Sequence, residues 1–160
     1  MLCGHLVVPA AETTALIPED HEPVLGDCYL EFESGHFPTE GGWIGNDPDP
    51  ERPAGREIAE FLLSVVDPGI PASEIWNEES YGWAFNCRIG KITVNVLVQF
   101  LESWLVIVQP VSLRPRFLRG AAYDEAVLEV CTRIHGGVQK VPRTGRAKWS
   151  TSNEYESAGR

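Results

Sequence analysis

The first half of the chain is poor in basic residues. Residues 1–80 contain 17 acidic and 2 basic residues, a net charge of -15, whereas residues 81–160 contain 6 and 11, a net charge of +5, and the halves sum to -10. Phosphate binding needs clustered Lys and Arg, and the basic stretch with Arg114, Arg116 and Arg119 supplies only three arginines. The sequence therefore predicts no nucleic-acid binding. An acidic surface favours a basic partner, although solubility alone also explains it.

No segment is apolar enough to cross a membrane. The longest apolar-rich stretch, residues 92–108, is interrupted by polar residues such as Asn95, Gln99 and Glu102. The first ten residues lack the basic segment and the long apolar run of a signal peptide. We therefore expect one cytoplasmic domain over residues 1–160, with no membrane contact.

The common motifs of catalysis and phosphate binding are missing as well. The sequence contains no GxSxG, no HExxH and no glycine-rich loop ending in lysine. None of its cysteines (Cys3, Cys28, Cys87 and Cys131) forms a CxxC pair, and their spacing is not that of a disulfide-rich domain. The sequence predicts reduced thiols, no catalytic residues, no cofactor and no metal.

One pair of residues leaves an enzymatic alternative open. Cys131 and His135 are four residues apart in a predicted helix and share a face, as a nucleophile and its base or two metal ligands would. Packing is the favoured explanation, because Cys131 falls on the apolar stripe and His135 lies near the helix C-terminus. Cys3 and His5 could add zinc ligands, but the paired spacing of zinc sites is missing.

A calcium loop is suggested only superficially by the alternating acids Asp47, Asp49 and Glu51. The twelve-residue calcium loop requires glycine at its sixth position and glutamate at its twelfth, which here are Arg52 and Ile58. The intervening prolines instead favour an extended backbone from which the acids project.

Hydrophobic periodicity predicts an α+β fold. An antiparallel sheet is expected to be built on a three-stranded meander over residues 82–109, with two helices packed on one face and polar side chains on the other. The predicted elements are a strand at 28–33, a Pro/Gly/acid-rich loop at 34–55, a helix at 56–66, strands at 82–89, 92–101 and 104–109, a helix at 122–135 stopped by Gly136-Gly137, a strand at 146–151, and a polar tail from 152.

Two tryptophans stand among acidic residues in the first half. Trp43 lies in the loop GGWIGNDPDPE, and Trp76 lies in SEIWNEESYGW. Such a loop aromatic either fills a gap in the core or anchors an interface inside a charged rim. On the second interpretation, the partner-binding residues are Phe37, Trp43, Asp47, Asp49, Glu51, Trp76, Glu78 and Glu79.

The second half contains the segments YGWAFNCRIG, ITVNVLVQ and SWLVIVQPVSLRPRFL, followed by a predicted helix and by KWSTSNEYES. In these segments it resembles a group of small bacterial immunity-type proteins, which neutralise toxins delivered between competing bacteria. The shared pattern is a GW-aromatic strand, a hairpin, a WLxIx strand, a basic linker, a helix and a terminal tryptophan strand. The resemblance implies a toxin inhibitor and transfers no binding residues.

The sequence thus predicts a non-enzymatic protein that binds and occludes a basic toxin. A small metal-assisted hydrolase and an adaptor or chaperone-like protein remain the alternatives.

Overall fold

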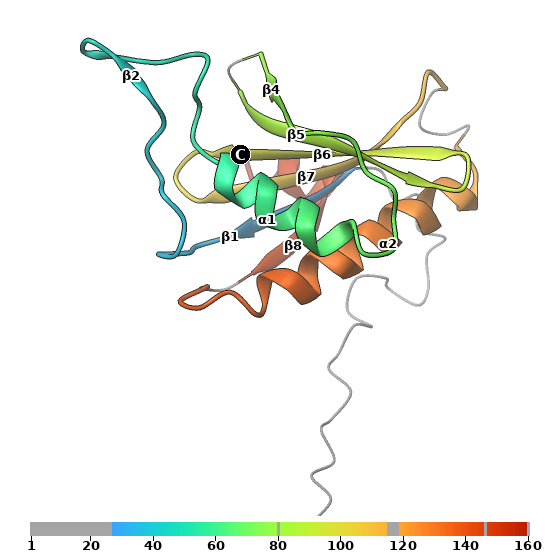
Figure 1. Ribbon diagram of the computed structural model, residues 1–160. Coiled ribbons are helices and arrows are strands. Elements are labelled where there is room, and N and C mark those ends of the chain that lie inside the picture. Colours follow the sequence, from blue (N-terminus) through green and yellow to red (C-terminus); the bar gives the residue numbers. More distant parts are fainter. Residues whose placement is uncertain (1–26, 80, 115–118, 146, 160) are drawn as a thin grey trace, which may run out of the picture.

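The computed structural model describes residues 27–79, 81–114, 119–145 and 147–159. For Trp43 and Ile44 it describes the backbone alone. The described residues form an antiparallel six-stranded open sheet, a separate two-stranded hairpin and three helices, which confirms the α+β class (Figure 1). The elements are β1 (Cys28–Phe32), β2 (Trp43–Ile44), β3 (Asp47–Pro48), α1 (Arg56–Val66), β4 (Trp76–Glu78), β5 (Gly82–Ile89), β6 (Ile92–Phe100), β7 (Trp104–Val111), α2 (Ala121–Val138), β8 (Lys148–Thr151) and α3 (Ser152–Ser157).

The predicted meander forms the centre of the sheet. The strand order is β4-β5-β6-β7-β1-β8, and each neighbouring pair is antiparallel. Strands β5 and β6 are joined by the two-residue turn that the sequence predicts, in which Gly90 adopts a φ of 60°. Glycine reaches this left-handed conformation without steric cost, which is why it suits so tight a turn.

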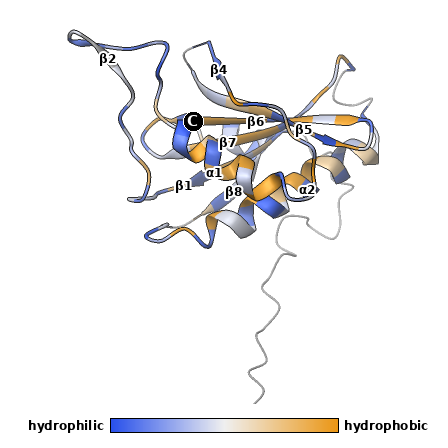
Figure 2. Cartoon of the chain, viewed as in Figure 1, coloured by the Kyte–Doolittle hydropathy of each residue, from blue (hydrophilic) through white to orange (hydrophobic). Residues whose placement is uncertain are grey.

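Helices α1 and α2 cover the same face of the sheet (Figure 1). In α1 the residues Ile58, Leu62 and Val66 are buried, and Figure 2 shows apolar positions along the sides of both helices that face the strands. They pack over the alternate residues of the meander, among them Phe85 and Val96, which are fully buried. Burying one such side chain stabilises the fold by about 1.5–3 kcal/mol.

The C-terminal end of α2 corrects one prediction. Gly136-Gly137 does not stop the helix, which continues to Val138. A Cβ on Gly137 would lie 2.7 Å from Cγ2 of Val65 in α1, so this glycine lets the two helices approach closely. A glycine pair near a helix end resembles a stop signal in sequence, although here one of the two serves a packing contact.

The segment after β8 is a short helix, where the sequence predicts a polar tail. Thr151 caps α3, because its hydroxyl accepts from the Glu154 N–H while the Glu154 carboxylate accepts from the Thr151 N–H. Tyr155 of α3 stacks on Tyr29, with ring centroids 4.5 Å apart. Tyr29 alternates with the core residue Leu30 along β1, so α3 lies on the face opposite α1 and α2.

The sheet face opposite α1 and α2 carries the predicted polar side chains. The Asn95 amide donates to the Asn86 side-chain oxygen over 3.1 Å, and the Gln109 amide donates to the Asn95 oxygen over 3.4 Å. This row of amides crosses β5, β6 and β7. The same face also carries Leu97 and Ile107, which are partly buried, so it is more apolar than the alternation predicts.

Candidate partner-binding surface

The loop predicted at residues 34–55 contains a small hairpin that projects from the body of the sheet (Figure 1). Strand β2 pairs with β3, and two backbone hydrogen bonds close the base of the hairpin. The Gly42 N–H donates to the Arg52 carbonyl, and the Asp49 N–H donates to the Gly42 carbonyl, each over 2.7 Å. The hairpin was not predicted, because two-residue strands leave no periodic signal.

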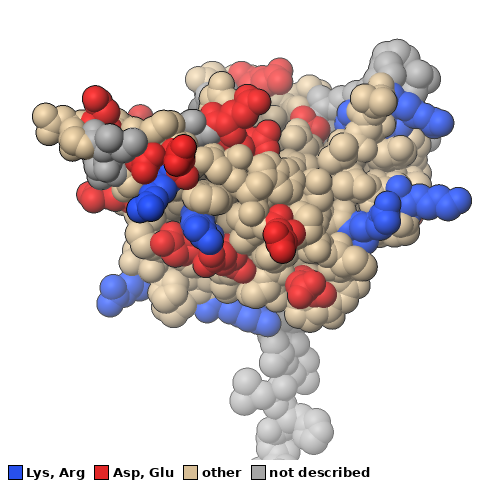
Figure 3. Space-filling view, turned by 45° about the horizontal axis from the view of Figure 1, so that its top comes forward, with Lys and Arg blue, Asp and Glu red and all other residues tan. Residues whose placement is uncertain are grey.

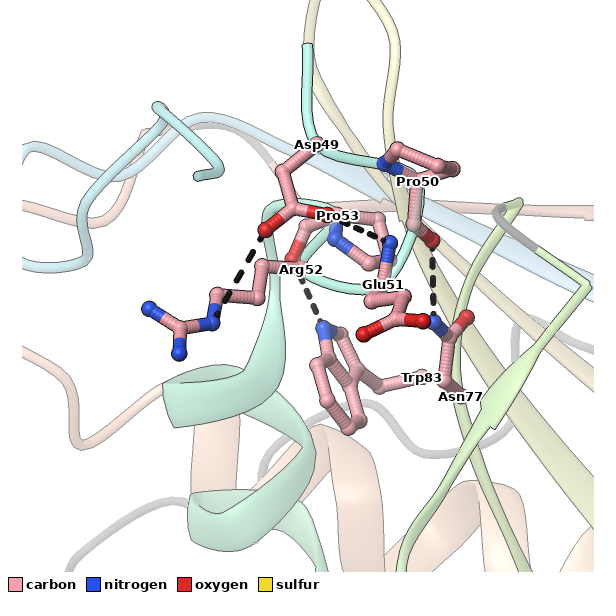
Figure 4. Close-up of polar contacts among 7 residues, drawn as sticks. All are labelled: Asp49, Pro50, Glu51, Arg52, Pro53, Asn77 and Trp83. Carbon is pink, nitrogen blue, oxygen red and sulfur yellow. Dashed lines mark hydrogen bonds and ion pairs between the residues drawn. The ribbon is translucent and has the colours of Figure 1, made fainter. Parts of the chain in front are cut away.

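A turn after β3 holds this loop against the sheet (Figure 4). The Asn77 side-chain amide of β4 donates to the Pro50 carbonyl over 3.0 Å, and the Trp83 indole N–H of β5 donates to the Pro53 carbonyl over 2.7 Å. Proline has no backbone N–H, but its carbonyl accepts hydrogen bonds as any other does, and its fixed φ keeps that carbonyl in a defined direction for both contacts. The two acidic segments, which lie far apart in sequence, are therefore side by side in the fold.

The three acids of the loop have different environments. Asp49 shapes the turn: its carboxylate accepts from the Glu51 N–H over 2.9 Å and lies 3.9 Å from Arg52 Nε, and its side chain is only 14% exposed. Asp47 and Glu51 are exposed. Of the predicted acidic loop residues, Asp47 and Glu51 thus point to solvent, and Asp49 stabilises the loop itself.

The second predicted segment forms the edge strand β4 and the turn that follows it. Trp76 is half-buried against the core and its indole N–H donates to the Glu78 carboxylate. Glu79 is exposed and adopts a left-handed backbone with a φ of 43°. The sequence missed β4, since three residues are too few to show alternation.

Of the predicted aromatic anchors in the loop, one can be placed. Phe37 is half-buried, with its ring centroid 5.0 Å from that of His36 and 5.7 Å from that of Phe61 in α1. It therefore packs the start of the loop onto α1. The side chain of Trp43 lies outside the described part of the structure, so its role as an anchor remains a prediction.

A cleft of about 420 Å³ lies between the loop and the start of α1. Trp83 forms one wall, and the guanidinium carbon of Arg56 lies 5.2 Å from the centroid of its ring, a cation–π distance. Arg56 also donates to Glu60 over 3.0 Å. The sequence predicts Trp83 within the strand at 82–89, and no pattern in it signals this contact with Arg56. The charged residues lining the cleft are Glu40, Glu51, Arg52, Arg56 and Glu57.

Residues 40–51, the first turn of α1 and residues 76–79 form one surface. We call this surface the acidic end. Figure 3 shows acidic side chains gathered at the left and along the upper edge, with a few basic side chains among them. Basic side chains project on the right of the same view. The β5–β6 hairpin carries Arg88 and Lys91. The charge asymmetry of the sequence is thus also a spatial one.

Cys131 and His135, the two residues of the enzymatic alternative, lie in different surroundings. Cys131 is buried beside Cys28, and burial raises the pKa of its thiol well above the usual value, which disfavours the nucleophilic thiolate. The Nδ1 atom of His135 accepts from the Trp149 indole N–H over 3.2 Å. Cys3 and His5 lie outside the described residues. In the part of the chain that the structure describes, no three His, Cys, Asp or Glu side chains are grouped as metal ligands would be.

No helix among the described residues has the length and apolar character needed to cross a membrane. No family model matches the chain, and a search of curated proteins finds no relative.

Proposed function

We propose that the chain is a non-enzymatic binding protein whose acidic end occupies a basic site on a partner protein, in the manner of an immunity protein that occludes a bacterial toxin. The observation that carries this proposal is the anchored loop. Asn77 and Trp83 hold it against β4 and β5, so that acids from two distant segments form one surface. The proposal places the protein in the cytoplasm of the cell that it protects.

The acidic end has the properties that such a contact requires. Asp47, Glu51 and Glu79 are exposed and available to Lys and Arg side chains of the partner. The hydrogen bonds at the base of the hairpin restrict the conformations open to the loop before binding. A pre-ordered loop loses little conformational entropy when it docks, so more of the interaction free energy appears as affinity.

The test is a pull-down from the source cells with the tagged protein, at low and then at high salt. We expect one basic protein in a one-to-one complex that dissociates as salt screens the charges. The captured protein should also be toxic when produced alone and harmless when produced with this chain. Absence of a partner at every salt concentration, or capture of many unrelated proteins, would contradict the proposal.

Trp43→Ala tests the hairpin directly. Truncating an interface anchor weakens a complex by about 2 kcal/mol or more, so the affinity should fall by at least about 30-fold. The free energy of unfolding of the isolated protein should stay within about 0.5 kcal/mol of the parent value, as for an ordinary surface substitution. A variant that unfolds would instead assign Trp43 to the core.

A further inference from the structure

A second cleft lies at the end of the sheet opposite the acidic end, and we call it the basic cleft. It has a volume of about 850 Å³ and is bounded by the residues that follow α1, the turn between β5 and β6, and the N-terminal part of α2. Figure 1 shows that turn and the projecting β2–β3 hairpin at opposite ends of the sheet. Binding cavities in proteins measure about 300–1,000 Å³, so this cleft is large enough to receive the tip of a loop.

The lining of the basic cleft combines apolar side chains with unpaired positive charge. Ile70 is buried at its base, and Ile89 and Ile92 are partly buried. Arg88 and Lys91 are exposed, and neither forms an ion pair within the described part of the chain. The cleft therefore suits an occupant that has both apolar and acidic side chains.

The acids on the α2 side of the cleft do not cancel its charge. Glu129 pairs with Arg133, whose Nε lies 3.0 Å from Glu129 Oε1. Glu125 is the other acid of the lining, so three basic and two acidic side chains leave a net charge of +1. Residues 43–51, in contrast, carry three acids and no basic residue, which gives a charge of -3.

The β2–β3 hairpin has the chemistry that the basic cleft requires. Its tip, residues 45–48, is exposed, and a Cβ on Gly45 would meet nothing within 4 Å. Asp47 lies in this tip, and Glu51 follows it with its side chain exposed. Strand β2 consists of Trp43 and Ile44, residue types that suit a cleft lined by isoleucines.

Within one molecule, the hairpin and the basic cleft cannot meet. The loop is anchored near the start of β5, where the Trp83 indole N–H donates to the Pro53 carbonyl. The cleft begins at Arg88 of the same strand, about 17 Å further along at about 3.3 Å per residue. The hairpin also projects away from the sheet (Figure 1). A second copy of the chain can bring the two surfaces together.

We propose that two copies of the chain form a two-fold dimer, in which the β2–β3 hairpin of each copy occupies the basic cleft of the other. Asp47 and Glu51 of one copy pair with Arg88 and Lys91 of the second. A two-fold arrangement makes this contact twice and leaves no cleft open, whereas a one-sided contact would extend into a filament or a ring. The dimer does not rest on the proposed function. It would cover the acidic end, so a basic partner would have to displace the second copy.

Sedimentation equilibrium of the purified full-length chain tests this proposal without any other protein. We expect a monomer–dimer equilibrium at low salt that shifts to monomer as salt screens the charges. Asp47→Lys with Glu51→Lys should weaken dimerisation by at least about tenfold, and so should Arg88→Glu with Lys91→Glu. All four positions are exposed, so circular dichroism should show that both double variants are folded.

Lys140→Glu with Lys148→Glu is the matched control for the second variant. It makes the same change in net charge at exposed positions outside the cleft, so it measures the effect of net charge alone. We expect it to weaken dimerisation much less than Arg88→Glu with Lys91→Glu does, because its charges do not face the hairpin.

Mixing the two charge-reversed variants gives the decisive result. The acids and bases have then exchanged places, so each variant alone should be monomeric and the equimolar mixture should form a heterodimer. A mixture that stays monomeric, or a control as weak as the cleft variant, would overturn the proposal. Growth beyond two copies would overturn the two-fold arrangement. So would a parent chain that is monomeric at every concentration, and the cleft would then have another occupant, such as residues 1–26, which contain acids and no Lys or Arg.

Discussion

The helix-covered core and the acidic end are held together by different forces. In the core, the alternate apolar residues of β5, β6 and β7 pack under α1 and α2 and are almost completely removed from water. At the acidic end, the loop is held by hydrogen bonds to proline carbonyls, one from Asn77 and one from Trp83. Burial of a core side chain contributes about 1.5–3 kcal/mol, whereas a hydrogen bond contributes about 0.5–1.5 kcal/mol net.

This difference separates the fold from the proposed binding surface. The core depends on shape and on burial of apolar surface, which do not rely on attraction between charges. The acidic end depends on a few polar contacts, and its exposed acids, such as Asp47 and Glu51, have no part in the core. Substitutions in one region should therefore change stability, and substitutions in the other should change binding.

The largest expected effect comes from reversing charge at the acidic end. Asp47→Lys combined with Glu51→Lys should weaken the complex with a basic partner by about 100-fold, because attraction becomes repulsion in both encounter and complex. The control, Asp67→Lys with Glu125→Lys, makes the same change in net charge at exposed positions outside the acidic end. Affinities come from calorimetry. Equal losses in both double variants would show that only net charge matters and that the acidic end has no special role.

A core substitution should give the opposite outcome. Gly137→Ala places a methyl group 2.7 Å from Val65 Cγ2, and such overpacking costs about 1–3 kcal/mol of unfolding free energy. In Gly136→Ala the new Cβ meets nothing within 4 Å, so the better helix propensity of alanine should stabilise by about 0.5–1 kcal/mol. Urea titration measures both. Partner affinity at a temperature where each variant is folded should not change, and a parallel loss of affinity would mean that the two regions are coupled.

The sequence predicted the core better than the acidic end, for a physical reason. Burial on one face imposes a period of two on strands and of 3.6 on helices, and β5, β6 and α1 show these periods over eight or more residues. The bounds predicted for α1 are those observed, and α2 is three residues longer at its C-terminal end because Gly137 packs against Val65 instead of stopping the helix.

At the acidic end, no such repeating constraint operates. Strands β2, β3 and β4 have two or three residues each, and their partners are chosen by long-range hydrogen bonds such as that from Asn77 to Pro50. The distribution of charged residues shows that the acids are concentrated in the first half of the sequence. It does not distinguish Glu51, which is exposed, from Asp49, which shapes the turn. In the same way, Thr151 and Glu154 form a capping box that starts α3, where the sequence analysis predicts the end of a strand at 151 and a polar tail from 152.

Alkaline pH should weaken the core and leave the acidic end unaffected. Burial raises the pKa of the Cys87 thiol from 9.0 to about 12, so above pH 9 the unfolded state loses this proton while the folded state keeps it. The Cys87 thiol should therefore leave the unfolding free energy unchanged below pH 9. Above pH 9 it should lower the unfolding free energy by up to about 1.4 kcal/mol per pH unit. Cys87→Ala should reduce this dependence, and the buried thiol of Cys131, whose pKa is also raised, should contribute to the slope that remains. An unchanged slope in this variant would contradict the assignment.

The smallest effect, and the sharpest test of the comparison, concerns a residue that links the two regions. Trp83 packs in the core and also donates its indole N–H to the Pro53 carbonyl at the base of the loop. Trp83→Phe keeps an aromatic ring and loses that hydrogen bond, so unfolding free energy should fall by about 1 kcal/mol. Trp149→Phe loses a comparable bond to His135, away from the acidic end. Urea titration should give similar stability losses for the two variants, and calorimetry should show that only Trp83→Phe weakens partner binding. If both variants bind equally well, the anchoring of the loop does not contribute to recognition.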